Sequence, residues 1–300
     1  MRFQLIRTYQ GHQDRIDALV PIPDQSRLVS ASQDGLIKIW NLRSDSSVIL
    51  RQSTSSYPTA LDVFPAGFFI ATGLSDGQIE IWNLETAEVI RRFEGHEGRI
   101  TALAITHSGH SLISASQDRT LRIWDALTGV RLHTCSHQSS EITTLSVTPD
   151  DKVVLAGQSG DQNAPGVTRA WQIETGVEIA EFNNIPNSRH YMAALKDGRH
   201  AVSGSEAGDI IVWDRQTGES VRHINAHPGP VVMALMPDQK SVVVGTPKPS
   251  LALWDLTTGE KTHQFDEPSG EVTSIAVTTD GRSVIAGCQD GSLNFYMRVS

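Results

Sequence analysis

Residues 28–40 read Leu28-Val29-Ser30-Ala31-Ser32-Gln33-Asp34-Gly35-Leu36-Ile37-Lys38-Ile39-Trp40, and this stretch recurs along the chain. Trp40, Trp82 and Trp124 stand 42 residues apart. Later copies end at Trp171, Trp213 and Trp254, and a seventh carries Tyr296, 42 residues after Trp254. All six tryptophans thus occupy one repeat position, which indicates a repeated structural role rather than six separate binding sites.

Each copy belongs to a longer unit of alternating apolar and polar residues. In the first unit, the runs 27–32 and 36–41 are joined by Gln33-Asp34-Gly35, which predicts a tight β-hairpin. Another apolar run, 16–22, precedes them and a fourth, 47–51, follows. Four short antiparallel strands per repeat are typical of a propeller blade. Since one blade cannot bury both faces of its sheet, successive blades must stack around an axis.

The two ends of the chain complete one another in this pattern. Residues 3–9 form a strand before the first full unit, whereas the last unit, from about residue 272, supplies only three strands. We therefore predict an all-β fold: a seven-bladed β-propeller of four-stranded antiparallel blades, forming one domain over residues 1–300. The N-terminal strand should complete the last blade by pairing with residues 292–297, which removes an exposed sheet edge.

Two units also share a polar constellation at matching offsets. Its members are a histidine, a serine, an aspartate and the tryptophan: His12, Ser30, Asp34 and Trp40, then His96, Ser114, Asp118 and Trp124. With these residues the chain resembles the WD-repeat family, of the type found in G-protein beta subunits, whose blades carry a hydrogen-bonded tetrad of these four residue types. The family's namesake Trp-Asp dipeptide occurs at 124–125, 213–214 and 254–255. A Ser-His-Asp catalytic triad is the competing interpretation, but it requires an exposed nucleophile.

The later units depart from this pattern. Thr54 replaces the histidine of the second unit, Ala207 replaces the aspartate of the fifth, and the seventh keeps only Asp290. We expect the second half of the ring to be the softer half. The fourth unit is five residues longer, and its extra length falls in 158–166, a polar, glycine-rich segment. Insertions of this kind map to loops and often to a binding face, whereas a calcium site would need more oxygens.

Composition limits the function. The formal charge of −9 argues against a nucleic-acid-binding surface. Neither a signal peptide nor a membrane-spanning run is visible, so we expect no membrane insertion. Cys135 and Cys288 fall in different blades, which favours free thiols in a reducing compartment and a cytoplasmic location. The sequence contains no metal-binding or phosphate-binding motif, so no metal and no cofactor are predicted.

The resemblance places the partner-binding surface on one rim of the ring, around the mouth of the central channel. Carried over by position, the predicted partner-binding residues are Arg15, Tyr57, Arg99, Arg119, Arg189 and Tyr191. Arginine and tyrosine are enriched at interface hot spots, and arginine suits forked recognition of carboxylates or phosphates. We predict a non-catalytic scaffold or adaptor that binds a protein or peptide there. The alternative is a propeller enzyme, of hydrolase or lactonase type, acting at the channel mouth.

Overall fold

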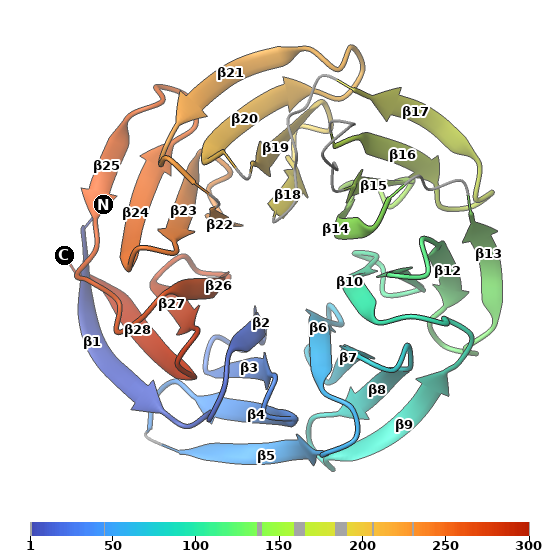
Figure 1. The fold of residues 1–300 in the computed structure, drawn as a ribbon, viewed down its shortest axis with the longest axis horizontal. Coiled ribbons are helices and arrows are strands. Elements are labelled where there is room, and N and C mark those ends of the chain that lie inside the picture. The colour runs from blue at the N-terminus through green and yellow to red at the C-terminus, as the bar shows by residue number, and fades with distance from the viewer. Residues whose placement is uncertain are drawn as a thin grey trace.

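Seven four-stranded antiparallel sheets form a closed ring in the computed structural model, as predicted (Figure 1). The structure describes residues 2–44, 46–136, 140–158, 166–183, 191–205, 207–229 and 231–299. The innermost strand of each blade lines the central channel and the outermost strand forms the circumference (Figure 1).

The first three blades follow the repeat closely. Blade 1 consists of β2 (Ile16–Pro21), β3 (Arg27–Ser32), β4 (Leu36–Asn41) and β5 (Ser47–Gln52). Blade 2 consists of β6 (Pro58–Val63), β7 (Phe69–Leu74), β8 (Ile79–Asn83) and β9 (Glu88–Phe93). Blade 3 consists of β10 (Ile100–Ile105), β11 (Ser111–Ser116), β12 (Leu121–Asp125) and β13 (Arg131–Cys135).

The next three blades keep the same strand order. Blade 4 consists of β14 (Ile142–Val147), β15 (Val153–Gln158), β16 (Thr168–Gln172) and β17 (Glu178–Phe182). Blade 5 consists of β18 (Tyr191–Ala194), β19 (His200–Gly204), β20 (Asp209–Asp214) and β21 (Ser220–Asn225). Blade 6 consists of β22 (Val232–Leu235), β23 (Ser241–Thr246), β24 (Ser250–Asp255) and β25 (Lys261–Gln264). Most of the predicted insertion 158–166, residues 159–165, lies outside the described residues.

Blade 7 joins the two ends of the chain. It consists of β26 (Val272–Val277), β27 (Ser283–Cys288), β28 (Ser292–Val299) and, as its outermost strand, β1 (Arg2–Gln10). The β1–β28 register runs from Gln10 opposite Ser292 to Arg2 opposite Val299, with a bulge at Ile6 between Leu5 and Arg7. The predicted closure by the N-terminal strand is confirmed.

The Asp-Gly turns work because glycine tolerates a left-handed backbone. Gly35 has φ +84°, and a Cβ there would lie 1.9 Å from the carbonyl oxygen of Ser53. In blade 3 the same turn position is held by Arg119, whose φ is +65°. A non-glycine residue in this region costs of order 1–3 kcal/mol, so blade 3 accepts strain at this turn.

The hydrophobic core is divided among the seams between neighbouring blades. The indole of Trp171 in blade 4 packs with Ile113 and Ile123 of blade 3, and Trp213 of blade 5 packs with Leu155 of blade 4. The phenol ring of Tyr296 takes the same place against blade 6. The repeated aromatic residue therefore fastens each blade to the one before it, which explains the spacing in the sequence.

The two faces of the ring carry different loops. We call the upper face the one with the loops that enter each innermost strand, such as residues 53–57, and the turns between second and third strands, such as 75–78. The lower face carries the remaining two loop types, such as residues 64–68 and 84–87. The predicted rim corresponds to the upper face.

Candidate functional site

Within the part of the chain that the structure describes, two blades contain the complete polar tetrad. In blade 1, His12 Nδ1 lies 2.9 Å from Asp34 Oδ2, His12 Nε2 lies 2.6 Å from Ser30 Oγ, and the Trp40 indole N–H donates to Ser30 Oγ at 2.8 Å. Blade 3 repeats the pattern: His96 contacts Asp118 at 2.7 Å and Ser114 at 2.8 Å, and Trp124 donates to Ser114 at 2.8 Å.

The histidine, serine and tryptophan side chains of both tetrads are buried, which favours a role in stabilising the blades over one in catalysis. Ser30 and Ser114 are fully buried, and both histidines are less than 10% exposed. Burial lowers the pKa of His12 and of His96 below the ordinary value, against the opposing pull of Asp34 and Asp118. Each serine hydroxyl already lies within hydrogen-bond distance of an indole and an imidazole, and no substrate can reach it. The catalytic-triad interpretation therefore fails for both blades.

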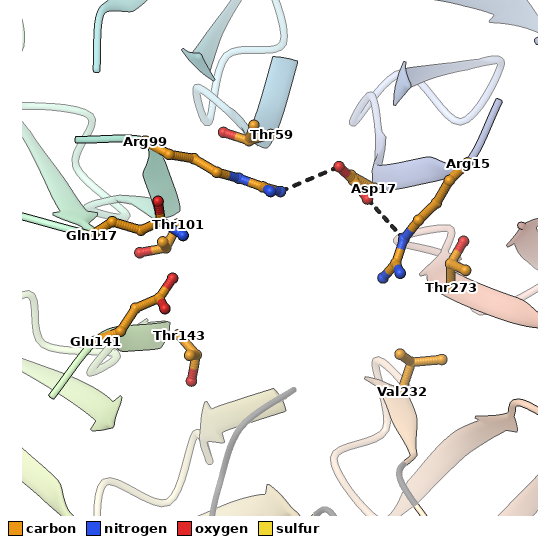
Figure 2. A pocket seen from close by; sticks show the side chains of 10 residues that line it. All are labelled: Arg15, Asp17, Thr59, Arg99, Thr101, Gln117, Glu141, Thr143, Val232 and Thr273. Carbon is orange, nitrogen blue, oxygen red and sulfur yellow. Dashed lines mark hydrogen bonds and ion pairs between the residues drawn. The ribbon is translucent and has the colours of Figure 1, made fainter. Parts of the chain in front are cut away.

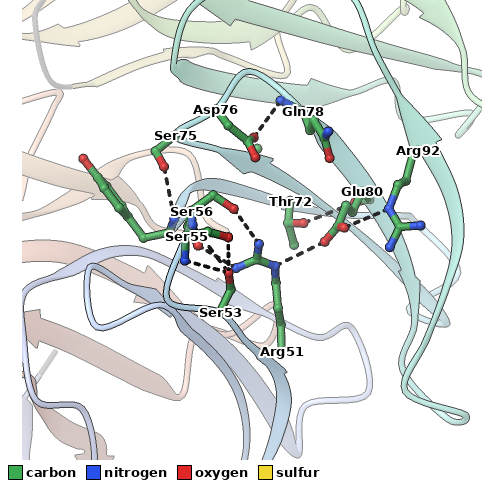
Figure 3. Close-up of polar contacts among 12 residues, drawn as sticks. Arg51, Ser53, Ser55, Ser56, Thr72, Ser75, Asp76, Gln78, Glu80 and Arg92 are labelled. Atoms are coloured by element: carbon green, nitrogen blue, oxygen red, sulfur yellow. Dashed lines mark hydrogen bonds and ion pairs between the residues drawn. The ribbon is translucent and has the colours of Figure 1, made fainter.

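Blade 2 replaces the tetrad with an ion-pair network (Figure 3). The indole N–H of Trp82 has no hydrogen-bond partner among the described residues. Instead, the buried carboxylate of Glu80 accepts from Arg51 Nε of blade 1 at 3.3 Å and from Arg92 Nε at 3.1 Å. Arg51 also donates to the carbonyl and hydroxyl oxygens of Ser56. The seam between blades 1 and 2 is thus fastened by charge-assisted hydrogen bonds.

Blades 5 and 6 show the degraded tetrads that the sequence predicts. Ser203 Oγ and Trp213 Nε1 are buried and have no hydrogen-bond partner within the described ranges. The same holds for His227 Nδ1 in blade 6. Unpaired buried polar groups are costly, so these blades depend on apolar packing. The predicted softness of the second half stays a prediction.

Several threonines lie just inside the upper mouth of the channel. Among the described residues, four blades place a threonine at the bulge of the innermost strand: Thr59, Thr101, Thr143 and Thr273. Three of these hydroxyls donate to a backbone carbonyl of the next blade, at 2.5, 2.5 and 2.7 Å. These three bonds link the innermost strands of blades 2 and 3, of blades 3 and 4, and of blades 7 and 1.

Asp17 takes the equivalent bulge position in blade 1, and its carboxylate pairs with two arginines (Figure 2). Arg15 Nε lies 2.9 Å from Asp17 Oδ1, and Arg99 Nη2 of blade 3 donates to Asp17 Oδ2 at 3.3 Å. Gln33 Nε2 also donates to both carboxylate oxygens, at 3.2 and 3.0 Å. The Asp17 side chain is only 7% exposed. One buried carboxylate therefore orients two guanidinium groups from different blades.

The arginines keep donors for a ligand. Arg15 contacts Asp17 as an ion pair, but its buried Nε is not aligned for a hydrogen bond and finds no other partner among the described residues. The side chains of Arg15 and Arg99 are 41% and 31% exposed. They border a cavity of about 350 Å³ that Gln117 and Glu141 also line (Figure 2). The Arg99 guanidinium carbon lies 5.5 Å from the ring centre of Tyr57, a cation–π contact that fixes its position.

The other predicted site residues divide into three cases. Arg119 is exposed at its strained turn on the upper face. Tyr191 is partly buried and its hydroxyl accepts from the backbone N–H of Leu235 at 2.9 Å, so its contact is with the neighbouring blade. Burial raises the pKa of Tyr191 to about 12, which keeps the hydroxyl protonated. Arg189 lies outside the described residues.

Asp17 was missed by reasoning from the sequence. A signal for it exists: at the 42-residue spacing Asp17 interrupts the series Thr59, Thr101 and Thr143. The arrangement offers several N–H donors around one cavity and is suited to binding a carboxylate or a carbonyl-rich peptide. The described part of the chain contains no cluster of three or more residues that could hold a metal ion. It also contains no helix long and apolar enough to cross a membrane.

The comparisons with known proteins divide the chain in two. The family model described as WD domain, G-beta repeat matches residues 3–41, 46–83, 87–125 and 129–164. The model described as outer membrane protein assembly factor BamB matches residues 163–297. A search of curated proteins matches none of them to this chain. The WD matches end in blade 4, after the last complete tetrad of the described residues. By its repeats and its seven-bladed ring, the chain belongs to the WD-repeat family.

Proposed function

We propose that the protein is a non-catalytic interaction scaffold that binds a protein or peptide at the upper mouth of the channel. WD-repeat propellers typically bind proteins, which supports the general role. The observation that carries the proposal is the Arg15–Asp17–Arg99 cluster. The Nε of Arg15 is ion-paired with Asp17 without making a hydrogen bond to any described residue, and the side chain borders a cavity of about 350 Å³. The side chains of Arg15 and Arg99 are partly exposed at the cavity wall, and a guanidinium group carries five N–H donors, so a ligand in the cavity can supply acceptors to both.

The arrangement limits the cost of binding. Asp17 and Tyr57 hold Arg99 in one orientation before a partner arrives, so less side-chain entropy is lost on association. Arginines in a desolvated central position are typical hot spots, while exposed residues such as Arg119 contribute at the border. A partner that offers carboxylate or backbone carbonyl oxygens would complete the hydrogen bonds of both guanidinium groups.

Affinity purification with a matched control tests the proposal. The triple variant R15Q/R99Q/D17N removes both cations and also the carboxylate that would otherwise be left buried and unpaired. The control R91Q/R222Q removes two arginines of the outermost strands, whose side chains contact the carbonyls of Thr128 and Thr258. We expect partners recovered by the wild type and the control to be lost from the triple variant.

Equal recovery of every partner by all three proteins would remove the upper mouth as the binding site. The BamB match to the second half leaves another propeller role open. Turnover across a panel of hydrolase and lactonase substrates, abolished in the triple variant, would favour the enzyme instead.

A further inference from the structure

A second groove lies on the lower face, where the two ends of the chain meet blade 1. It has a volume of about 440 Å³. Its walls come from β1, from β28 of blade 7 and from loops of blades 7 and 1. The upper-face site shares none of these residues. Because three distant segments build it, the groove exists only when the ring is closed.

The charge of this groove contrasts with that of the whole protein. Three arginines line it, Arg7, Arg43 and Arg282, against a single carboxylate, Asp280. The protein as a whole carries a formal charge of −9. Local excess positive charge favours an acidic ligand, because opposite charges attract and steer the encounter.

Two of the three arginines are available to a ligand. The Arg43 side chain is exposed, and within the described ranges the structure gives it no hydrogen bond or ion pair. Arg282 is 78% exposed, and its Nε lies 3.9 Å from Asp280, at the limit of an ion pair. The Asp280 carboxylate is already engaged, because it accepts from Thr278 Oγ1 at 2.7 Å and from the Arg282 backbone N–H at 3.0 Å.

Apolar side chains accompany the arginines. Ile6 is 47% exposed and Met297 is 40% exposed, and both line the groove. Ile6 is the bulged residue of β1, so its backbone has no register partner in β28 and its side chain is displaced from the regular pleat. Arg7, the next residue, lies over the Tyr9 ring at 5.6 Å and is thereby oriented. The groove thus offers guanidinium donors next to an aliphatic surface.

We propose that this lower groove binds an extended acidic segment of a partner protein, in which an aspartate or glutamate stands beside an aliphatic side chain. The carboxylate would pair with Arg43 and Arg282, and the aliphatic side chain would cover Ile6 and Met297. A concave groove of this volume accommodates side chains of a peptide, whereas a lipid surface would require protruding residues. With an independent site on each face, the ring could hold two partners at once.

Selection of peptides from a display library of random 12-residue sequences tests this inference. The wild type alone is used for selection, and R43E/R282E is kept for the binding measurements. The enriched peptides should contain Asp or Glu beside Leu, Ile, Val or Met. As synthetic peptides they should bind R43E/R282E at least tenfold more weakly than the wild type. Their affinity for R15Q/R99Q/D17N and for the control R222E should stay within twofold of the wild type. Their binding should also weaken as salt is raised.

Other outcomes overturn the proposal. Enriched peptides that are basic, or that bind R43E/R282E as well as the wild type, would contradict it. So would peptides that lose affinity only for R15Q/R99Q/D17N, a result that would leave the upper-face scaffold intact. If inorganic phosphate alone competes fully and replacing the aliphatic residue by serine has no effect, the groove is a simple anion site and the peptide assignment is wrong. Thermal unfolding of each variant verifies that the ring is folded.

Discussion

Removing one tetrad hydroxyl should destabilise blade 3 far more than the same change destabilises blade 5. In S114A, the indole N–H of Trp124 and Nε2 of His96 both lose their partner, and both side chains are less than 10% exposed. Each buried group left unsatisfied costs about 1–3 kcal/mol, so we expect a loss of about 2–6 kcal/mol in the free energy of unfolding.

Ser203 is the matched control, because it occupies the equivalent strand position and is equally buried. Its hydroxyl has no hydrogen-bond partner among the described residues, so S203A should change stability by less than about 1 kcal/mol. Calorimetry and urea titration of the three proteins measure the difference. At roughly 2 °C per kcal/mol, S114A should lower Tm by roughly 4–12 °C and S203A by roughly 2 °C at most. Equal shifts would refute the view that only the complete tetrads stabilise their blades.

Three further predictions concern strain, pH and closure. R119G should raise Tm by roughly 2 °C, because glycine relieves about 1 kcal/mol of strain at φ +65°; a fall in Tm would contradict this. Burial raises the pKa of Asp62 from 3.8 to about 6, so the folded state favours the protonated acid, and stability falls as pH rises between these values. D62N should remove this pH dependence and exceed the wild type in stability by at most about 3 kcal/mol at pH 7. If stability changes with pH in the same way in D62N and in the wild type, this prediction is wrong. Deleting residues 2–10 removes β1 and should unprotect the β28 amides in hydrogen exchange, whereas unchanged protection would show that β1 is dispensable for closure.

The number of blades and their closure could be predicted because they rest on local patterns. The Asp-Gly turns and the tryptophan on the third strand of six blades can be recognised in short windows of sequence. The loss of the tetrad in blade 5 follows from Ala207 in the same way. The ion-pair network around Glu80 could not be predicted, since Arg51 reaches it from another blade.

The candidate site was predicted in part. Arg15, Arg99 and Tyr57 come together as a cluster on the predicted rim, but the residue that organises the two arginines, Asp17, depends on a contact between residues 82 apart in sequence. Tyrosine is a residue type that is enriched at interfaces, yet the hydroxyl of Tyr191 accepts a hydrogen bond from the backbone N–H of Leu235 in the neighbouring blade. The lower groove was missed entirely, because its walls belong to opposite ends of the chain.

Site-specific photo-cross-linking tests the upper-face binding site most directly. A p-benzoylphenylalanine at Gln117 lies on the wall of the cavity, whereas the same group at Val221, which is 57% exposed on β21, lies on the circumference. In an extract of cells that express the protein, we predict that Gln117→p-benzoylphenylalanine captures a partner and that adding R15Q/R99Q/D17N abolishes the capture. Capture from Val221 alone, or capture from Gln117 that survives the triple variant, would contradict binding at the arginine cluster.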